Sequence, residues 1–326
     1  MRNNGIRLLT GVLAACAMLL AGCGSGGGEA QNGSGETRVV TDDFGTQVAV
    51  PVRPERVVAT FFSPMMGLLD LGVTPVGAAA WQPPLVTSAY ADRLAGVPVV
   101  TSREGEPELE QIAAQSPDLI VATSYTNEQV IGRLRTIAPT YVVRLSAGGA
   151  NATSWQDRSK QLGDVLGRSA ENDRLAADFA ARVQQMKQTY APRIAGRTVA
   201  IVAGFQENNA AVFSAASGSG RILTDLGFRY SAQADAVAGR ETNGLAQVSF
   251  ERIGSVAGDA DTLFLGSDLQ GRVSPFVTSL QQTQLYKDLP SVKANRVGAF
   301  KPQVTGYTDA NFLLDQVEKL LKGMPA

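Results

Sequence analysis

The stretch LEQIAAQSPDLIV, residues 109–121, recurs in altered form as FERIGSVAGDADTLFL, residues 250–265. In both copies an apolar residue precedes a glutamate, an isoleucine follows two positions later, and an aspartate leads a run of large apolar residues. This pattern predicts a short helix that feeds an internal strand. The separation of the copies is about right for one α/β lobe, which predicts two similar lobes with Glu110 and Glu251 at matching positions. The alternative is that each glutamate is simply solvated, because the helix dipole favours acidic residues in a first turn.

Composition limits the classes of protein that this chain can belong to. Its 326 residues, 44% of them apolar, are enough to bury the cores of two ordinary domains. The 29 basic residues against 30 acidic ones, without a basic run, argue against a nucleic-acid partner. The absence of histidine removes most zinc and copper sites and the commonest nucleophile pairs. Because no P-loop, G-x-S-x-G or HExxH motif is present either, we expect no enzyme, no cofactor and no metal site.

Residues 1–22 have the pattern of a signal peptide. A basic start precedes an apolar run from Leu8 to Leu20 that is too short to span a membrane, and small residues follow. The sequence Leu-Ala-Gly-Cys that ends at Cys23 resembles the bacterial lipoprotein signal, and this resemblance implies cleavage before Cys23 and its lipidation. The alternative is a plain secretory signal in which Cys23 is incidental. Residues 23–37, rich in glycine and serine, have the composition of a flexible tether.

Strand and helix patterns alternate from residue 38 onward. A hairpin is predicted over residues 37–50 around an Asp-Asp-Phe-Gly turn. The following segments predict strands at 56–61, 75–80, 118–122 and 141–145, with helices at 64–71 and 127–137. Such alternation predicts a parallel sheet covered by helices, with a ligand bound beyond the carboxyl ends of its strands. We assign residues 38–170 to this first lobe.

A second alternating set follows a long predicted helix. After a glycine-rich break at 146–150, Thr153 and Ser154 offer N-caps for a helix to about residue 166. Residues 171–192 then predict an inter-lobe helix of roughly 30 Å, stopped by Pro192. Its apolar stripe consists of Leu175, Phe179, Val183, Met186 and Tyr190. Residues 193–326 form the second predicted lobe, which ends in a helix over 309–321.

From Asp43 to Leu321 the chain resembles the substrate-binding proteins of bacterial ABC importers for iron-siderophores, haem and cobalamin. Beside the two copies around Glu110 and Glu251, the resemblance rests on phrases in a fixed order: Asp43-Phe44-Gly45, Pro54-Glu55-Arg56-Val57-Val58, Leu71-Gly72-Val73-Thr74-Pro75-Val76-Gly77, Ile137-Ala138-Pro139-Thr140 and Leu285-Tyr286-Lys287-Asp288-Leu289-Pro290. The lipoprotein signal fits the same family independently.

The resemblance implies an α/β fold of two similar lobes joined by one long backbone helix, with a ligand cleft between them. It also implies an extracytoplasmic protein, held at the outer face of the cytoplasmic membrane only by its lipid anchor. In similar proteins a glutamate on each lobe meets arginines of the permease dimer, and these positions align with Glu110 and Glu251. We expect a monomer that docks through this pair.

Candidate ligand-binding residues follow the ends of the predicted strands. Aromatic rings with a few arginines suit a bulky, flat chelate that carries negative oxygens. The candidates are Phe61, Phe62, Trp81, Ser124, Tyr125, Arg221, Arg240 and Tyr307. Phe61 and Phe62 are equally consistent with a core position, Arg221 with a helix cap and Arg240 with a solvated loop.

The favoured ligand is a ferric siderophore, because the chelator already satisfies the iron and the sequence offers no metal ligand of its own. Haem is the alternative, with a tyrosine such as Tyr125 or Tyr307 in place of histidine. Cobalamin stays open for the same reason. A cell-surface interaction module is a third possibility, which failure to bind any chelate would favour.

Overall fold

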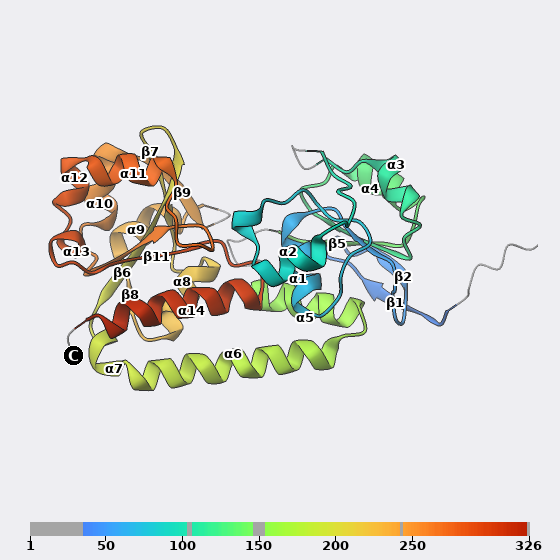
Figure 1. Ribbon diagram of the computed structural model, residues 1–326, viewed down its shortest axis with the longest axis horizontal. Coiled ribbons are helices and arrows are strands. Elements are labelled where there is room, and N and C mark those ends of the chain that lie inside the picture. The colour runs from blue at the N-terminus through green and yellow to red at the C-terminus, as the bar shows by residue number, and fades with distance from the viewer. Residues whose placement is uncertain (1–34, 103–105, 146–153, 242–243, 325–326) are drawn as a thin grey trace, which may run out of the picture. The chain divides into compact units, whose positions relative to one another are not determined.

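Two α/β lobes follow one another along the chain (Figure 1). The computed structural model describes residues 35–102, 106–145, 154–241 and 244–324. The predicted signal peptide, Cys23, most of the predicted tether and the predicted break at 146–150 lie outside these residues. Across the described ranges, no helix is both long enough and apolar enough to cross a membrane.

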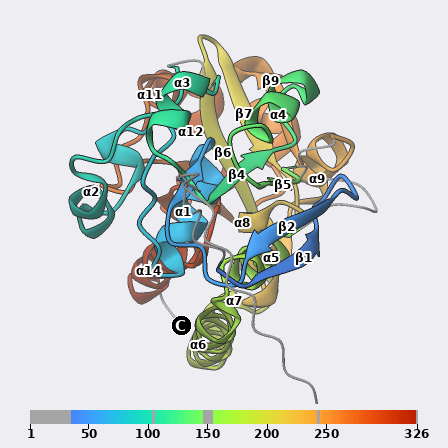
Figure 2. The same ribbon diagram turned by 90° about the vertical axis from the view of Figure 1, so that its right-hand side faces the viewer.

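The first lobe begins with the predicted hairpin, in which β1 (Thr37–Thr41) pairs antiparallel with β2 (Gln47–Pro51). Its sheet then has the parallel order β3 (Val57–Ala59), β4 (Leu119–Thr123) and β5 (Thr140–Val143). Every residue of these three strands is buried, as expected for a parallel sheet covered on both faces. The helices of this lobe are α1 (Phe62–Asp70), the short η1 (Pro83–Leu85), α2 (Ser88–Leu94), α3 (Leu109–Ala114) and α4 (Glu128–Leu134). Figure 2 shows the hairpin beside α5, at the edge of this lobe.

The strand predicted over 75–80 does not form as a regular strand. The segment runs beside β3, but it pairs only through isolated bridges, Val58 with Gly77 and Ala78 with Val99. Pro75 and Pro98 lack backbone N–H groups, so neither can donate to a continuous ladder. Single bonds remain, such as the one from Ala78 N to Pro98 O at 2.9 Å.

The connection between the lobes is made by two helices. Ser154 and Asp157 form a capping box that starts α5 (Trp155–Val165), as the sequence predicted. The 21-residue α6 (Ser169–Thr189) begins and ends slightly earlier than predicted. Pro192 does not stop it: the helix ends at Thr189, and Pro192 lies inside the short α7 (Ala191–Ile194), where its missing N–H costs nothing. Four of the five residues of the predicted stripe, Phe179, Val183, Met186 and Tyr190, are buried, and Leu175 is partly buried against the core.

The second lobe has a mixed sheet in the order β11, β10, β6, β7, β9, with β8 paired to β6. Strand–helix alternation predicts a parallel sheet, and only part of this sheet is parallel. The strand β10 (Thr262–Gly266) pairs parallel with the edge strand β11 (Val297–Phe300) on one side and with β6 (Thr198–Gln206) on the other. However, β6 turns directly into β7 (Asn209–Phe213), which is antiparallel to it and to β9 (Leu245–Ser249). Asn208 takes the left-handed conformation, φ 57°, that this tight turn requires.

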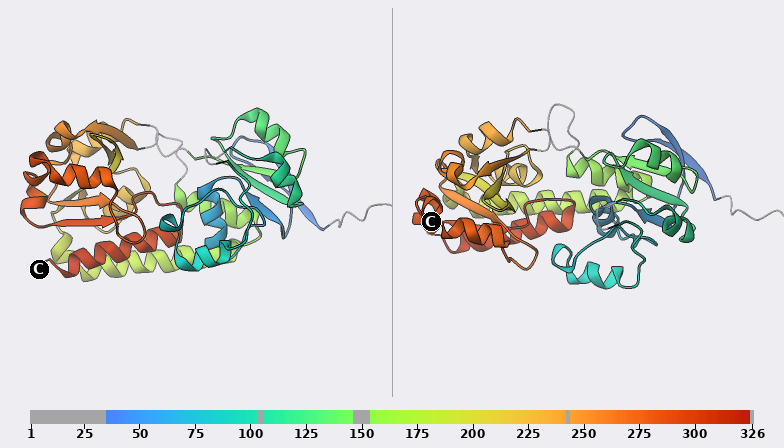
Figure 3. Two further views of the ribbon diagram at one scale, coloured as in Figure 1. Left: turned by 45° about the horizontal axis from the view of Figure 1, so that its top comes forward. Right: turned by 90° about the horizontal axis from the view of Figure 1, so that it is seen from above.

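Helices cover both faces of the second sheet (Figure 3). They are α8 (Gly218–Asp225), α9 (Ala232–Ala238), η2 (Phe250–Arg252), α10 (Ile253–Ala257), α11 (Pro275–Gln282), α12 (Gln284–Lys287), α13 (Pro290–Lys293) and α14 (Tyr307–Lys322), with β8 spanning Arg229–Tyr230. The helices α6 and α14 run side by side (Figures 1 and 3). The ion pair of Arg182 with Asp315 joins them. One end of α5 also reaches this lobe, since Trp155 belongs to its core whereas Leu162 belongs to the core of the first lobe.

Candidate functional site

A cavity of about 920 Å³ lies between the lobes. Its walls come from loops that follow β3, β4, β5, β7 and β11, together with the first turns of α1, α5 and α8. Carboxyl ends of strands and amino ends of helices converge there, which is the usual position of ligand sites in α/β folds. This volume lies within the range of pockets that enclose ligands of drug size.

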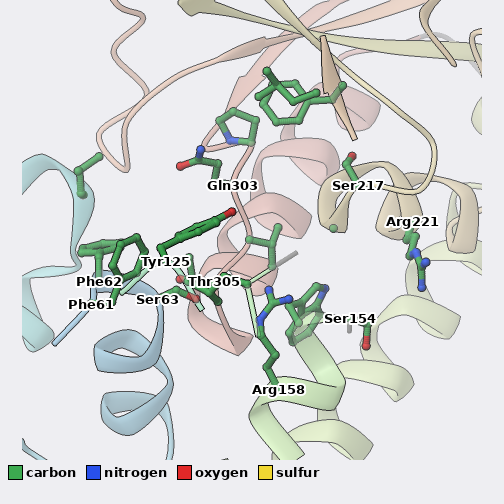
Figure 4. Close-up of a pocket in the computed structure, with 18 of the residues that line it drawn as sticks. Phe61, Phe62, Ser63, Tyr125, Ser154, Arg158, Ser217, Arg221, Gln303 and Thr305 are labelled. Atoms are coloured by element: carbon green, nitrogen blue, oxygen red, sulfur yellow. The ribbon is translucent and has the colours of Figure 1, made fainter. Parts of the chain in front are cut away.

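Aromatic rings form the wall contributed by the first lobe. Phe61 is the N-cap residue of α1, Phe62 opens that helix, Trp81 follows the irregular segment 75–80, and Tyr125 follows β4. The rings of Phe61 and Tyr125 meet edge to face with centroids 5.8 Å apart. Tyr125 is 64% exposed although it lies in the cavity wall. Figure 4 shows Phe61, Phe62 and Tyr125 gathered on one side of the cavity. These four predicted residues therefore present ring surface to the cavity, and their contact with a ligand stays a prediction.

Two arginines contribute positive charge to the cavity. Arg221 extends from α8; its guanidinium donates to Ala216 O through Nε at 3.1 Å, and the residue is exposed. Arg158 extends from α5 and was not predicted from the sequence. Burial lowers the pKa of Arg158, while Tyr125, Asp43 and Asp157 act in the opposite direction. A guanidinium group remains charged at neutral pH under such conditions, because its ordinary pKa is above 12. Figure 4 shows Arg158 and Arg221 on different helices, both away from Phe61 and Phe62.

The remaining lining is polar but not acidic. Ser63, Gln82, Ser154, Ser217, Gln303 and Thr305 offer hydroxyl and amide groups. None of the described lining residues is an aspartate or a glutamate. The cavity therefore combines an aromatic wall with two cations and neutral hydrogen-bonding groups, which favours a ligand that has a flat apolar surface and negative oxygens. Likewise, no group of three or more His, Cys, Asp or Glu residues in the described parts of the chain is placed to hold a metal ion.

Three predicted ligand residues lie outside the cavity lining. Ser124 accepts a hydrogen bond from Leu145 N at 3.0 Å through its hydroxyl, so it joins the ends of β4 and β5. Arg240 is exposed just after α9, which agrees with the alternative that it is a solvated loop residue.

The prediction that Tyr307 faces the ligand needs correction, because its ring is enclosed and only 2% exposed. It packs edge to face against Trp155 and Phe179, with centroids 5.0 and 6.2 Å away. Burial, with the nearby charges of Asp70 and Asp173, raises the pKa of Tyr307 to about 12. The sequence could not show this, because a tyrosine that begins a helix after a strand is equally consistent with a cleft and a core.

The two glutamates of the repeated phrase are both exposed. Glu110 lies in the first turn of α3 on the first lobe, and Glu251 lies in η2 on the second. Neither lines the cavity between the lobes. Their positions are compatible with the predicted docking surface and equally with solvated side chains.

Comparison with known proteins gives a consistent result over most of the chain. The model of the periplasmic binding protein family matches residues 57–304. YfiY of Bacillus subtilis, a probable siderophore-binding lipoprotein, is 27% identical over 92% of this chain and 93% of its own length. YfmC of the same organism, an Fe(3+)-citrate-binding protein, is 26% identical over 90% and 89%. The structure of a siderophore periplasmic binding protein from the fuscachelin gene cluster of Thermobifida fusca has a TM-score of 0.71 at 30% identity, over 84% of this chain and 99% of that one.

Proposed function

This chain belongs to the periplasmic binding protein family, and we propose that it captures a ferric siderophore outside the cytoplasmic membrane and delivers it to the permease of an ABC importer. Its similarity to a probable siderophore-binding lipoprotein, an Fe(3+)-citrate-binding protein and a siderophore periplasmic binding protein supports this ligand class. These relatives are binding proteins by name, so we expect capture and release rather than catalysis.

The observation that carries the proposal is the chemistry of the cavity. A ferric siderophore is a chelate in which the organic ligand fills the coordination sites of the iron. The protein therefore recognises the outside of the complex and supplies no metal ligand. Phe61, Trp81 and Tyr125 offer faces for the flat parts of such a chelate. Arg158 and Arg221 offer guanidinium groups for its carboxylate or catecholate oxygens. Because no acidic side chain is present among the described lining residues, we expect an anionic chelate to bind more tightly than a neutral or cationic one.

Haem is a weaker candidate on the same geometry. A histidine-free chain needs a tyrosine to bind haem iron, and enclosure of Tyr307 removes one of the two tyrosines that we considered. Tyr125 remains, with its ring in contact with Phe61. The names of the relatives favour siderophores over haem and cobalamin.

A binding panel tests the proposed function. The purified chain is titrated with ferric citrate, ferric enterobactin, ferrioxamine B, haemin and cyanocobalamin, and binding is followed by calorimetry and by quenching of tryptophan fluorescence, since Trp81 lines the cavity. We expect one of the anionic ferric chelates to bind with a stoichiometry of one and unchelated ferric ion to show no specific binding. Preferred binding of haemin or cobalamin would show that the ligand belongs to that class and not to the ferric siderophores. Failure of every compound would favour an interaction module instead.

Two further parts of the proposal concern the membrane. We propose that Cys23 is the lipidated residue and that the mature chain is a monomer held by this anchor alone. We also propose that Glu110 and Glu251 meet arginines of the permease dimer. Exposed ion pairs contribute only about 0.2–1 kcal/mol each, so the pair orients and accelerates docking more than it adds affinity.

A further inference from the structure

A buried ion pair contacts residues of the cavity lining but is not part of the site described so far. Lys301, immediately after β11, is 5% exposed, and its Nζ lies 2.6 Å from Oδ2 of the fully buried Asp309 in the first turn of α14. A charged pair in this position must be desolvated on both sides, which costs several kcal/mol per ion before the two attract each other. The pair is therefore a poor source of stability.

The pair holds the segment that forms one side of the cavity. Nζ of Lys301 also donates to Gln303 O at 2.9 Å. Oδ2 of Asp309 accepts the backbone N–H of Thr305 at 3.1 Å and also the Thr305 hydroxyl. Gln303 and Thr305 both line the cavity, so two buried charges fix the conformation of this lining segment, residues 302–305.

The same ammonium group also reaches the opposite lobe. Nζ of Lys301 lies 5.7 Å from the centroid of the Phe62 ring, the first residue of α1 and part of the aromatic wall. A cation over a ring at this distance is attracted by the ring's quadrupole, and more strongly when both are desolvated. One side chain thus contacts a wall residue of the first lobe and the lining segment of the second.

The hydrogen bonding of Asp309 is incomplete in a way that fits this role. Its Oδ1 is buried and accepts no hydrogen bond from any residue within the described ranges. A pair selected only for stability would satisfy both oxygens, because an unsatisfied buried acceptor costs about 1–3 kcal/mol. Every observed bond of this carboxylate instead goes to Lys301 or to Thr305.

We propose that Lys301 is a positioning residue for the ligand cavity: through Asp309, Gln303 O and the Phe62 ring it sets the shape of the lining segment 302–305 relative to the aromatic wall. It touches no ligand itself. This inference rests on the proposed function for its consequence in binding, but its structural part does not depend on any ligand.

The test separates position from stability. The double variant Lys301→Met/Asp309→Asn replaces both charges by neutral side chains of similar size, so no uncompensated charge is left buried. We expect a melting temperature close to that of the wild type, with amide hydrogen exchange at Thr305 at least tenfold faster, because its N–H loses the charged acceptor Asp309 Oδ2 and the bond of Lys301 to Gln303 O is lost as well. Unchanged exchange at this amide would overturn the proposal. Lys322→Met, on an exposed ion pair of the same helix, is the matched control and should change neither quantity.

The binding measurement uses the compound of the five-compound panel that the wild type binds most tightly. The double variant should bind it at least fivefold more weakly than the wild type, whereas Lys322→Met should bind it equally well. Faster exchange with unchanged affinity would remove the role in binding. If the double variant does not fold, Thr305→Val removes only the hydroxyl bond to Asp309 and keeps the ion pair intact, and it carries the same two measurements and the same expectations at reduced size. If the wild type binds no compound, the proposed function fails, while hydrogen exchange still decides whether Lys301 holds the segment.

Discussion

Asp70 caps the last helix of the chain from the opposite lobe, by accepting hydrogen bonds from Thr308. The Thr308 backbone N–H donates to Asp70 Oδ1 at 3.3 Å and its hydroxyl donates to the same oxygen at 2.6 Å. The N-cap residue of α14 is Gly306, which has no side chain with which to cap the helix. A Cβ at Gly306 would lie 2.1 Å from Asp70 Oδ2, so glycine is needed for the carboxylate to approach. The end of α1 and the start of α14 are thus joined across the lobes by the hydrogen bonds of one carboxylate.

The first prediction concerns the pH dependence of this cap. Burial and the negative charge of Asp309 raise the pKa of Asp70, although Thr308 and the hydroxyl of Tyr90 donate to it. The folded state therefore holds the proton more tightly than the unfolded state, and stability must fall as pH rises from about 4 through the raised pKa. Asp70→Asn removes this titration. We expect its free energy of unfolding to exceed that of the wild type increasingly as pH rises through that window, in denaturant titrations at several pH values. A difference that stays constant with pH, or that grows toward acid, would contradict the assignment.

The second prediction concerns Tyr307, whose ring joins α5, α6 and α14 through Trp155 and Phe179. Tyr307→Phe keeps the ring and should leave both chelate affinity and stability nearly unchanged. Tyr307→Ala removes a buried ring and should lower the free energy of unfolding by about 3–5 kcal/mol. Chemical denaturation and calorimetric titration measure the two quantities. Loss of ligand affinity in Tyr307→Phe, without loss of stability, would return this tyrosine to the list of ligand contacts.

The two-lobe fold was predictable from the repeated phrase, because the aspartate of each copy makes the same local hydrogen bonds. Asp118 N donates to Arg56 O and Asp118 Oδ1 accepts from Arg56 N, both at 3.0 Å. In the second lobe, Asp261 N donates to Thr198 O at 2.9 Å and Asp261 Oδ2 accepts from Thr198 N at 3.0 Å. In both lobes an aspartate before one strand is joined to the start of the neighbouring strand. Because both lobes use an aspartate at this position for the same hydrogen bonds, the residue pattern recurs in the sequence. The two-lobe fold could therefore be predicted.

The joints between the lobes could not be predicted in that way. Asp70 with Thr308, and Lys301 with Phe62, are pairs of residues far apart in sequence whose partners follow no shared pattern. Arg158 lies one turn into a helix whose start was predicted, yet a helical arginine is usually solvated, and only the packing of α5 turns this one toward the cavity. Tyr307 was misplaced for the converse reason, since its neighbours Trp155 and Phe179 come from two other helices.

The third prediction concerns the two cavity arginines. Arg158→Gln and Arg221→Gln should each weaken binding of an anionic ferric chelate tenfold or more, since a desolvated arginine at an interface hot spot contributes about 2 kcal/mol or more. Arg240→Gln, an exposed arginine outside the cavity lining, is the matched control and should bind as the wild type does. Calorimetric titration gives the dissociation constants. Equal losses in all three variants would point to net charge rather than to contact, and loss in Arg240→Gln alone would restore the original prediction for that residue.

The fourth prediction concerns docking through Glu110 and Glu251. Because both side chains are exposed and lie outside the cavity lining, Glu110→Ala/Glu251→Ala should leave chelate affinity within about twofold of the wild type. Uptake of iron-55 chelate by cells should nevertheless fall sharply, since the oriented encounter with the permease is lost. Glu128→Ala changes another exposed first-turn glutamate of the first lobe and should transport normally. Normal uptake by the double variant would leave the two glutamates as solvated first-turn residues.

The last prediction concerns the anchor, and its argument rests on sequence because Cys23 lies outside the described residues. If Cys23 carries lipid, more than one acyl chain is needed to hold the mature protein, since a single chain gives only marginal and reversible membrane binding. Cys23→Ala should therefore appear in the medium or keep its signal peptide, and it should lose incorporation of labelled palmitate. Cys16→Ala is a matched control, because that cysteine lies inside the predicted signal and would be removed with it. Fractionation, labelling and mass spectrometry of the mature N-terminus report the outcome. A processed Cys23→Ala protein that stays in the membrane fraction would mean that another part of the chain, or a partner, supplies the attachment.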